Sequence, residues 1–242
     1  MSIQKISNSL YKKLAKSNKV SASEKAGRYK QHKGLEKIIF RDITKKLALK
    51  KKDTFLDIGC GCGPLTDLLV NFCQKKKISL TLCDILPIIK ILKKKYKKLR
   101  NIDYISKEFQ KVKFKNKYDK ILCYSVIQCV DLPLFFLKKL FYLLNKNGKA
   151  LIGDIPNINK KFRFLQSNYG KNYEKKNYGK IVNYKNFNQY KKLNLQNKKI
   201  NDDFVLKILR YARNMNKTAY VVNQNTKLPF SLTREDILVE EF

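Results

Sequence analysis

The residues best suited to chemistry are one acid and three glycines that recur at every second position. Asp57 is followed by Gly59, Gly61 and Gly63, directly after a short apolar run. Glycine adopts positive φ angles with little strain and lets a ligand approach the main chain closely. An ordinary tight turn between a strand and a helix could use the same glycines, but the acid adds a charged group to the turn. The pattern favours a site for a nucleotide-type ligand.

A second acid, Asp84, follows the apolar segment 78–83. It stands about 20 residues beyond the last glycine, which is the spacing at which nucleotide-binding α/β folds place an acid for the ribose hydroxyls. An alternative role is to cap the helix that begins near Pro87. We expect Asp84 to bind ribose and its neighbour Ile85 to lie at the same site.

These residues need a parallel sheet that brings the ends of its strands together. Apolar segments with strand character alternate with amphipathic segments along most of the chain, and this alternation is typical of α/β folds. The expected strands lie at 54–58, 78–85, 102–106, 120–125, 150–155, 219–222 and 236–239, and the expected helices at 35–50, 64–76, 87–100, 134–144 and 202–215. The pair Asn147 and Gly148 is expected to end the fourth of these helices.

Asp57 and the glycines after it resemble motif I of the class I S-adenosylmethionine-dependent methyltransferases, an acid followed by G-x-G-x-G. A dinucleotide-binding turn would read G-x-G-x-x-G instead. The resemblance extends over residues 35–155 and 202–242. It implies an α/β, Rossmann-like mixed sheet of seven strands in the order 3-2-1-4-5-7-6, flanked by helices. It also implies that S-adenosylmethionine is the cofactor and that Asp57 lies near its methionine amino group.

The same resemblance indicates further cofactor contacts. Family members often place an acid after the third strand, against the adenine amino group, and Glu108 is the nearest acid here, although its neighbours differ from the usual Gly-Asp pair. Residues 125–130, after the fourth strand, are similar to the S-V-L-H-H-V motif of small-molecule methyltransferases. Ser125 and Gln128 are therefore expected at the cofactor site, together with Cys60. Amino-methyltransferases of DNA and RNA would show Asn/Asp-Pro-Pro-Tyr/Phe here, so that class is disfavoured.

The chain divides into four parts around this core. They are a helical leader at 1–34, a cofactor-binding core at 35–156, a Lys/Asn/Tyr-rich insertion at 157–200, and a helix with a β-hairpin at 201–242 that completes the sheet. In the leader, Ile3, Ile6, Leu10 and Leu14 fall on one face of a short helix. Such a helix could cover the ligand site as a lid or simply pack on the edge of the core.

The insertion at 157–200 admits two interpretations. Its tyrosines alternate with lysines, a composition that could stack bases or sugars and hold phosphate as a substrate cap. The same bias is also typical of an insertion without fixed structure. Lys160, Lys161 and Arg163 follow the fifth strand closely and are the candidates for binding an anionic substrate.

The chain is strongly basic, with 54 Lys and Arg against 19 Asp and Glu and a formal net charge of +35. Such a charge attracts the phosphates of nucleic acids or of metabolites. The lysines are spread along the whole chain and asparagine is also abundant, so we attribute most of the charge to the codon bias of an AT-rich genome. No apolar run of about 18 residues and no signal-peptide pattern occur, which predicts a cytoplasmic protein without a membrane span.

The six cysteines lie mostly in segments that are expected to be buried, and no disulfides are expected in the cytoplasm. The Cys60-x-Cys62 pair has no second pair or histidine cluster that would complete a metal site. No metal is therefore expected, and the resemblance implies a reaction that needs none.

The implied reaction is an in-line displacement, in which a nucleophile of the substrate attacks the sulfonium methyl group. A base assists if the nucleophile is a hydroxyl. His32 is the only histidine of the sequence and a candidate for this base, and Asp154 at the end of the fifth strand and Tyr124 are the alternatives.

Three functions remain open. The first is O-methylation of a small anionic or sugar-like molecule, a sugar or phosphorylated precursor of a surface polysaccharide such as capsule. It is suggested by the motif after the fourth strand and by segments 153–157 and 225–238, which resemble methyltransferases of bacterial surface-polysaccharide gene clusters. The second is tRNA or rRNA methylation, which the charge favours. The third is a non-catalytic methyltransferase-like subunit, which the intact Asp57, glycines and Asp84 disfavour.

Overall fold

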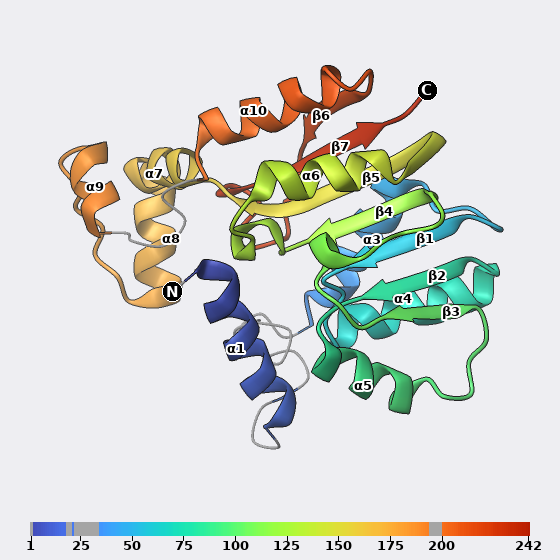
Figure 1. Ribbon diagram of the computed structural model, residues 1–242. Helices are drawn as coiled ribbons and strands as arrows, with labels where there is room; N and C mark the ends of the chain where they lie inside the picture. Colours follow the sequence, from blue (N-terminus) through green and yellow to red (C-terminus); the bar gives the residue numbers. More distant parts are fainter. Residues whose placement is uncertain (1, 18–20, 22–33, 194–199) are drawn as a thin grey trace.

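Seven strands form one open sheet in the computed structural model, which describes residues 2–17, 21, 34–193 and 200–242 (Figure 1). The strands are β1 (Thr54–Ile58), β2 (Ser79–Cys83), β3 (Ile102–Ile105), β4 (Tyr118–Tyr124), β5 (Leu144–Pro156), β6 (Thr218–Val222) and β7 (Arg234–Glu240). Their order in the sheet is β3-β2-β1-β4-β5-β7-β6. This confirms the predicted α/β fold and its strand order.

The direction of the strands brings the expected site residues together. β1 to β5 run parallel, whereas β7 is antiparallel to both β5 and β6. At the carboxyl edge, Ile58 of β1 pairs with Cys83 of β2 and Cys123 of β4, and Cys83 pairs with Ile105 of β3. The segments that follow these strands therefore leave the sheet side by side, as ligand sites in open α/β sheets require.

Helices cover both faces of the sheet because its central strands are apolar on both sides. These helices are α3 (Glu36–Leu47), α4 (Pro64–Lys76), α5 (Leu86–Lys95), α6 (Pro133–Tyr142) and α10 (Asp202–Arg213). Leu56 and Ile121 pack in a core cluster with residues of α6 and α10. Phe55 and Leu122 pack in a second cluster with residues of α3, α4 and α5. The sheet is thus the middle of three layers (Figure 1).

Strand β5 begins earlier than the sequence suggested. α6 ends at Tyr142, and the chain enters β5 two residues later, at Leu144. β5 contains a bulge against β4, since its partner residues jump from Leu144 to Lys149 while β4 advances only from Tyr118 to Lys120. Asn147, which was expected to end the helix, adopts a φ of 62° within this bulge. The Asn-Gly pair therefore bends a strand instead of stopping a helix.

The described part of the insertion is helical. It contains α7 (Ile158–Gln166), α8 (Asn168–Tyr178) and α9 (Phe187–Leu193). The side chains of Asn157 and Ser167 cap α7 and α8 by accepting hydrogen bonds from main-chain N–H groups. Phe164 of α7 contacts two tyrosines of α8, and Phe162 of α7 contacts two rings of α9. Buried residues of α7 and α9 form a small cluster separate from the main core.

The leader contains α1 (Ile3–Lys16), which lies outside the three layers, beside the carboxyl edge of the sheet (Figure 1). It contacts α5 and the 3-10 turn η3 (Ile127–Cys129). Its amino end is capped by Ser2, whose side chain accepts a hydrogen bond from Lys5 N. α1 is therefore placed next to the segments that leave β1, β2 and β4.

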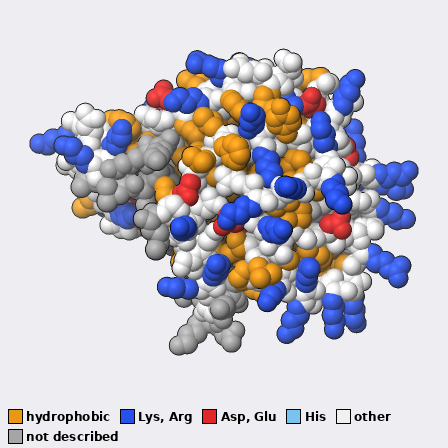
Figure 2. Space-filling model, viewed as in Figure 1, with side chains coloured by type: hydrophobic (Ala, Val, Ile, Leu, Met, Phe, Trp, Pro, Cys, Tyr) orange, Lys and Arg blue, Asp and Glu red, His pale blue; other side chains and the backbone are white. Residues whose placement is uncertain are grey.

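Basic side chains are scattered over the face shown in Figure 2 instead of gathering over one element. This agrees with a charge that is distributed along the sequence. In the part of the chain that the structure describes, no helix has the length and apolar composition needed to cross a membrane.

Candidate functional site

The glycine turn joins β1 to α4 and lines a cleft at the carboxyl edge of the sheet. Gly59 and Gly61 have φ angles of +68° and +64°, which other residues rarely adopt. A Cβ on Gly59 would lie 2.5 Å from a methyl group of Val126, whereas nothing lies within 4 Å of the Cβ position of Gly61. The first glycine is thus required by packing, and the second leaves the main chain bare toward open space.

Local contacts hold this turn in place. Gly63 precedes the first residue of α4, Pro64, whose missing N–H is not needed there. The hydroxyl of Thr66 donates a 2.6 Å hydrogen bond to the carbonyl of Cys60. The first residues of α4 line the cleft, so the N–H groups that have no partner within the helix lie beside it.

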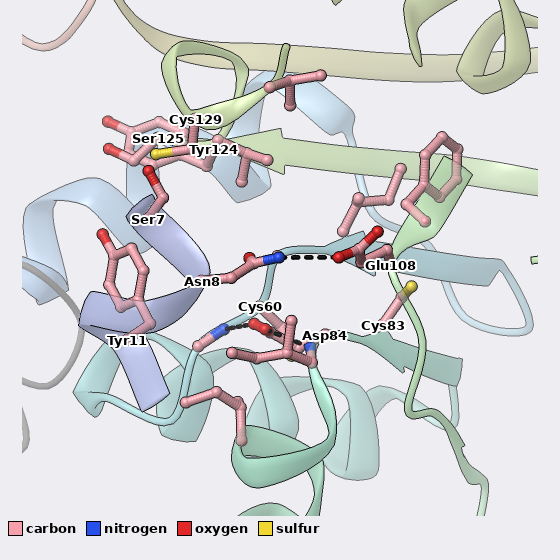
Figure 3. Close-up of a pocket in the computed structure, with 18 of the residues that line it drawn as sticks. Ser7, Asn8, Tyr11, Cys60, Cys83, Asp84, Glu108, Tyr124, Ser125 and Cys129 are labelled. Atoms are coloured by element: carbon pink, nitrogen blue, oxygen red, sulfur yellow. Dashed lines mark hydrogen bonds between the residues drawn. The ribbon is translucent and has the colours of Figure 1, made fainter. Parts of the chain in front are cut away.

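The cleft is bounded by the segments after β1, β2, β3 and β4 and by α1 (Figure 3). It contains about 1180 Å³ of space not filled by protein atoms, part of it open to solvent. The lining residues expected from the sequence are Gly59, Cys60, Gly61, Gly63, Asp84, Ile85, Glu108, Tyr124 and Ser125. A cleft of this size and position can hold a nucleotide-sized ligand.

Asp84 connects the end of β2 to the glycine turn. Its Oδ2 accepts a 2.8 Å hydrogen bond from Gly61 N, and its Oδ1 accepts a 2.7 Å bond from Ile85 N (Figure 3). Burial raises the pKa of Asp84 to about 6, and the two main-chain hydrogen bonds oppose this rise. The carboxylate lines the cleft, half-buried, where ligand hydroxyls or a cationic group would meet it.

Asp57 is buried and is not among the described residues that line the cleft. Its neighbours in the strand explain this, because side chains alternate across a sheet and the next residue, Ile58, does line the cleft. Burial raises the pKa of Asp57 to about 8, and the nearby charge of Asp84 adds to the rise. Asp57 therefore influences the site through charge and through the turn, from behind the lining.

Glu108 connects the cleft to the leader helix. Its Oε1 accepts a 2.9 Å hydrogen bond from the side-chain amide of Asn8 (Figure 3). Its Oε2 pairs with Lys111 at 2.7 Å. The acid after β3 thus lies at the site even though its sequence context departs from the expected Gly-Asp pair.

The leader contributes residues that the sequence did not identify. Ser7, Asn8 and Tyr11 of α1 point into the cleft (Figure 3). The apolar face of the same helix points elsewhere, since Ile3 and Ile6 are 47% and 52% exposed. The signal that could have found this arrangement is the uncharged polar stripe at positions 4, 7, 8 and 11, which has helical spacing.

Ser125 and Asp154 form the other side of the site, at the ends of β4 and β5. Both adopt positive φ angles, 59° and 57°. The Ser125 hydroxyl donates a hydrogen bond to Asp154 Oδ2. Asp154 and Tyr124 also line a smaller cavity with Phe230, next to the main cleft. Tyr124 borders both cavities.

A network from distant parts of the chain fixes Asp154. Arg234 Nη1 lies 2.9 Å from Asp154 Oδ2, and the guanidinium stacks over the Phe230 ring at 4.7 Å. The main-chain N–H of Asp154 donates a 2.8 Å bond to the fully buried Asp236, which is paired with Lys46 of α3 at 2.7 Å. Arg234 and Lys46 had no recognisable sequence signal, because neither belongs to a local motif.

Gln128 supports the site without lining it. Its Nε2 donates a 2.9 Å bond to the carbonyl of Ser125. Its buried Oε1 has no hydrogen-bond partner among the described residues. Gln128 is thus positioned to hold the turn after β4, and the cleft itself is bounded there by Ser125.

The three basic residues expected to hold a substrate have different surroundings. Lys160 is paired with Glu235 at 2.9 Å, and Arg163 makes two hydrogen bonds to Asp202. Lys161 is exposed and has no ion pair within the described residues. Of the three, Lys161 is therefore the one available to an anionic ligand.

Two further expectations concern residues beyond this geometry. His32 lies outside the described residues. Within the described ranges, no group of three or more His, Cys, Asp and Glu side chains could hold a metal ion.

The sequence and the fold were compared with known proteins. Residues 49–186, more than half of the chain, match a family model described as a methyltransferase domain. No curated protein gives a significant match.

Similar solved structures span nearly the whole chain. The plantazolicin methyltransferase BamL, in complex with a triazolic desmethylPZN analog and S-adenosyl-L-homocysteine (SAH), is 14% identical, with a TM-score of 0.60 over 97% of this chain and 98% of that one. The plantazolicin methyltransferase BpumL with SAH is 14% identical, with a TM-score of 0.59 over 99% of each chain. The N-methyltransferase NodS from Bradyrhizobium japonicum WM9 with SAH is 13% identical, with a TM-score of 0.55 over 90% of this chain and 94% of that one. At these identities the likeness establishes the fold.

Proposed function

Because this chain belongs to the methyltransferase domain family, we propose that it binds S-adenosylmethionine in the cleft above the glycine turn and transfers a methyl group to an oxygen of a small acceptor. The observation that carries this proposal is the pairing of Gly61 N with Asp84 Oδ2. This hydrogen bond holds the glycine turn next to an acid at the end of the neighbouring strand. A glycine turn and such an acid are the two features that an adenosyl ligand needs.

The electrostatics of the cleft fit a cationic ligand. Asp57 and Asp84 both have raised pKa values because burial disfavours their charged forms. A ligand that brings positive charge stabilises both carboxylates. S-adenosylmethionine carries a sulfonium and an ammonium group, and when bound it supplies an electrophilic methyl group to an attacking nucleophile.

The chain's own residues position the two reactants. Asp84 accepts hydrogen bonds at the ribose position, and Glu108 does so at the adenine side. α1 covers the cleft with Ser7, Asn8 and Tyr11, and we propose that it acts as a lid that excludes water. Residues that follow β1, β2 and β3 would hold the donor, which would leave the ends of β4 and β5 for the acceptor.

We propose that the acceptor enters the smaller cavity beside Tyr124 and Asp154. Both described hydrogen bonds to the Asp154 carboxylate reach Oδ2, which leaves Oδ1 for a proton from an acceptor hydroxyl. Tyr124 borders the donor cleft and this cavity, so it can orient the hydroxyl. His32 stays a further candidate for the base.

The proposed acceptor is a sugar or a phosphorylated precursor of a surface polysaccharide. The exposed Lys161 and the cation Arg234 beside Asp154 favour an anionic acceptor. The net charge of +35 adds a general attraction for phosphate. The same charge favours the alternative function, methylation of tRNA or rRNA.

Titration calorimetry and product analysis separate these possibilities. We expect S-adenosylmethionine to bind, and Asp84→Asn to weaken it. Incubation with labelled cofactor and sugar nucleotides or sugar phosphates should give a methylated product. Methylation of bulk RNA alone would overturn the acceptor class and leave the methyltransferase activity standing. Absence of any cofactor binding would favour a non-catalytic subunit.

A further inference from the structure

A third cavity lies between the helical insertion and the loop that joins β6 to β7. One wall consists of Phe164 of α7 with Tyr169, Tyr173, Asn177 and Tyr178 of α8. The opposite wall is the loop segment 226–232, from which Thr226, Lys227, Leu228, Pro229, Ser231 and Leu232 line the cavity. We call this cavity the tyrosine groove.

The tyrosine groove adjoins the cavity that contains Asp154, the proposed site of methyl transfer. The small cavity that contains Asp154 shares Tyr124 with the donor cleft. It shares Leu35, Leu228 and Pro229 with the tyrosine groove. The three cavities therefore lie next to one another, with the cavity of Asp154 between the donor cleft and the tyrosine groove. We call this row of cavities the path.

The wall on α8 is an array of aromatic rings. Tyr169 and Tyr173 are one helical turn apart, with ring centroids 6.3 Å apart and an interplanar angle of 33°. Tyr178 follows at 6.2 Å from Tyr173, and Phe164 contacts both of the first two rings. Tyr169 is 63% exposed, so one ring is open to a partner. Such rings stack on bases and on the apolar faces of sugars.

Two lysines lie at or near the path between the rings and Asp154. Lys227 lines the groove itself. Lys161 lines none of the three cavities. Burial lowers its pKa, and the nearby charge of Arg234, the partner of Asp154, adds to the lowering, so Lys161 lies near that end of the path. A ligand with a flat ring and a negative charge beside it is complementary to this surface.

Resting on the proposed function, we infer that the acceptor is elongated and that the tyrosine groove binds its distal end, a nucleoside diphosphate. The acceptor is then a nucleotide-activated sugar. Its base stacks on the Tyr169–Tyr173 wall, its phosphates meet Lys227 and Lys161, and its sugar reaches Tyr124 and Asp154. A bare sugar phosphate fills only the inner part of this path.

The chain contains no tryptophan, so Tyr169→Trp introduces a single fluorescent reporter at the groove. We expect UDP and UDP-glucose to change its emission saturably in the presence of S-adenosyl-L-homocysteine. Glucose 1-phosphate should bind at least about tenfold more weakly, because it lacks the ring that stacks. Calorimetry of the unmodified protein measures the affinities for the same three ligands without any substitution.

Paired variants locate the binding. Tyr173→Ala should lower the affinity for UDP-glucose about fivefold to a hundredfold, the range for loss of one stacking ring. Tyr173→Phe should keep this affinity within about twofold of the unmodified protein. Lys161→Gln should lower the affinity for UDP and leave the affinity for uridine unchanged, because the substitution removes only the charge that attracts phosphate. Lys171→Gln, an exposed change on α8 away from the groove, is the matched control and should alter neither.

The same variants should bind S-adenosylmethionine with unaltered affinity. This measurement separates the inference about the groove from the proposed function. If the cofactor binds but UDP-glucose does not, or binds equally to the Tyr173→Ala variant, the inference about the groove is wrong. An oligoribonucleotide that binds through Tyr173 more tightly than UDP-glucose would also overturn it, in favour of an RNA acceptor. Loss of cofactor binding in the unmodified protein would refute the proposed function itself.

Discussion

Replacing Asp84 by Asn should weaken cofactor binding and, at the same time, stabilise the ligand-free protein. The reason is the position of this acid. It is half-buried at the end of β2, and burial raises its pKa from 3.8 to about 6. The ionised form is therefore unfavourable in the ligand-free protein, although it is the form that would accept hydrogen bonds from ribose and attract a cationic cofactor at the proposed site.

The size of the stabilisation follows from the pKa. A shift of one pKa unit corresponds to about 1.36 kcal/mol, so ionised Asp84 costs the fold up to about 3 kcal/mol at neutral pH. Partial exposure reduces this figure, and Asn keeps only one of the hydrogen bonds from Gly61 N and Ile85 N. We expect a net gain of about 1–2 kcal/mol, or a rise in Tm of about 2–8 °C.

The gain has a defined pH window. A carboxyl group whose pKa is raised in the folded state destabilises the folded protein increasingly as the pH rises. For Asp84 this occurs between the pKa of the unfolded state, 3.8, and that of the folded state, about 6. The advantage of Asp84→Asn should therefore be complete above about pH 7 and absent below about pH 4. Loss of charge-assisted hydrogen bonds to the cofactor costs about 1.5–3 kcal/mol of binding free energy, which raises the Kd by about 10-fold to 150-fold.

Thermal denaturation at several pH values and titration calorimetry at pH 7.5 test both effects in one variant. Asp103→Asn, an exposed acid on β3, is the control and should change neither Tm nor affinity. Unaltered cofactor affinity in Asp84→Asn would refute the assignment of this acid to the ligand. A lower Tm at neutral pH would refute the claim that its charge is disfavoured in the empty cleft.

Further predictions concern the acids, the leader and the base. Asp57→Asn should raise Tm increasingly from about pH 4 and in full above about pH 8. It should lower the affinity for the cofactor less than Asp84→Asn does, because Asp57 does not line the described cleft. Asn8→Ala removes the bond to Glu108 and should speed cofactor release about fivefold in stopped-flow measurements; an unaltered rate would exclude α1 as a lid. His32→Gln should lower turnover at least about tenfold with cofactor binding intact, and unaltered turnover would exclude His32 from the mechanism.

The sheet could be predicted because its signals are local. Each buried strand is a short apolar run, and the alternation with helices fixes the parallel direction. The start of β5 could not be predicted in this way. The bulge at Asn147 depends on how Leu144 and Lys149 pair with β4, and this register is a property of two strands that are far apart in sequence.

Residues that line the cleft could be predicted where they follow the ends of strands. They could not be predicted where the direction of a side chain decides whether it lines the cleft. Asp84 and Glu108 line the cleft as expected, because Asp84 directly follows β2 and Glu108 lies three residues beyond β3. Asp57 lies behind the lining because it precedes the end of β1 by one residue and points to the opposite face from Ile58. The apolar stripe of α1 suggested which face was buried, but its contacts with the cleft are polar, as Asn8 illustrates.

The two sides of the proposed site use positive φ angles for opposite purposes. At the donor side, glycine adopts them at Gly59 and Gly61 with little strain, and the absence of side chains exposes the main chain to the ligand. At the acceptor side, Ser125 and Asp154 adopt them at a cost on the order of 1–3 kcal/mol each. Glycine would remove that cost but also the hydroxyl and the carboxylate. The hydrogen bond between the two side chains and the ion pair with Arg234 hold the strained conformation. The proposed site thus has side chains on its acceptor side, where they could orient a substrate, and bare main chain on its donor side, where a cofactor would need room.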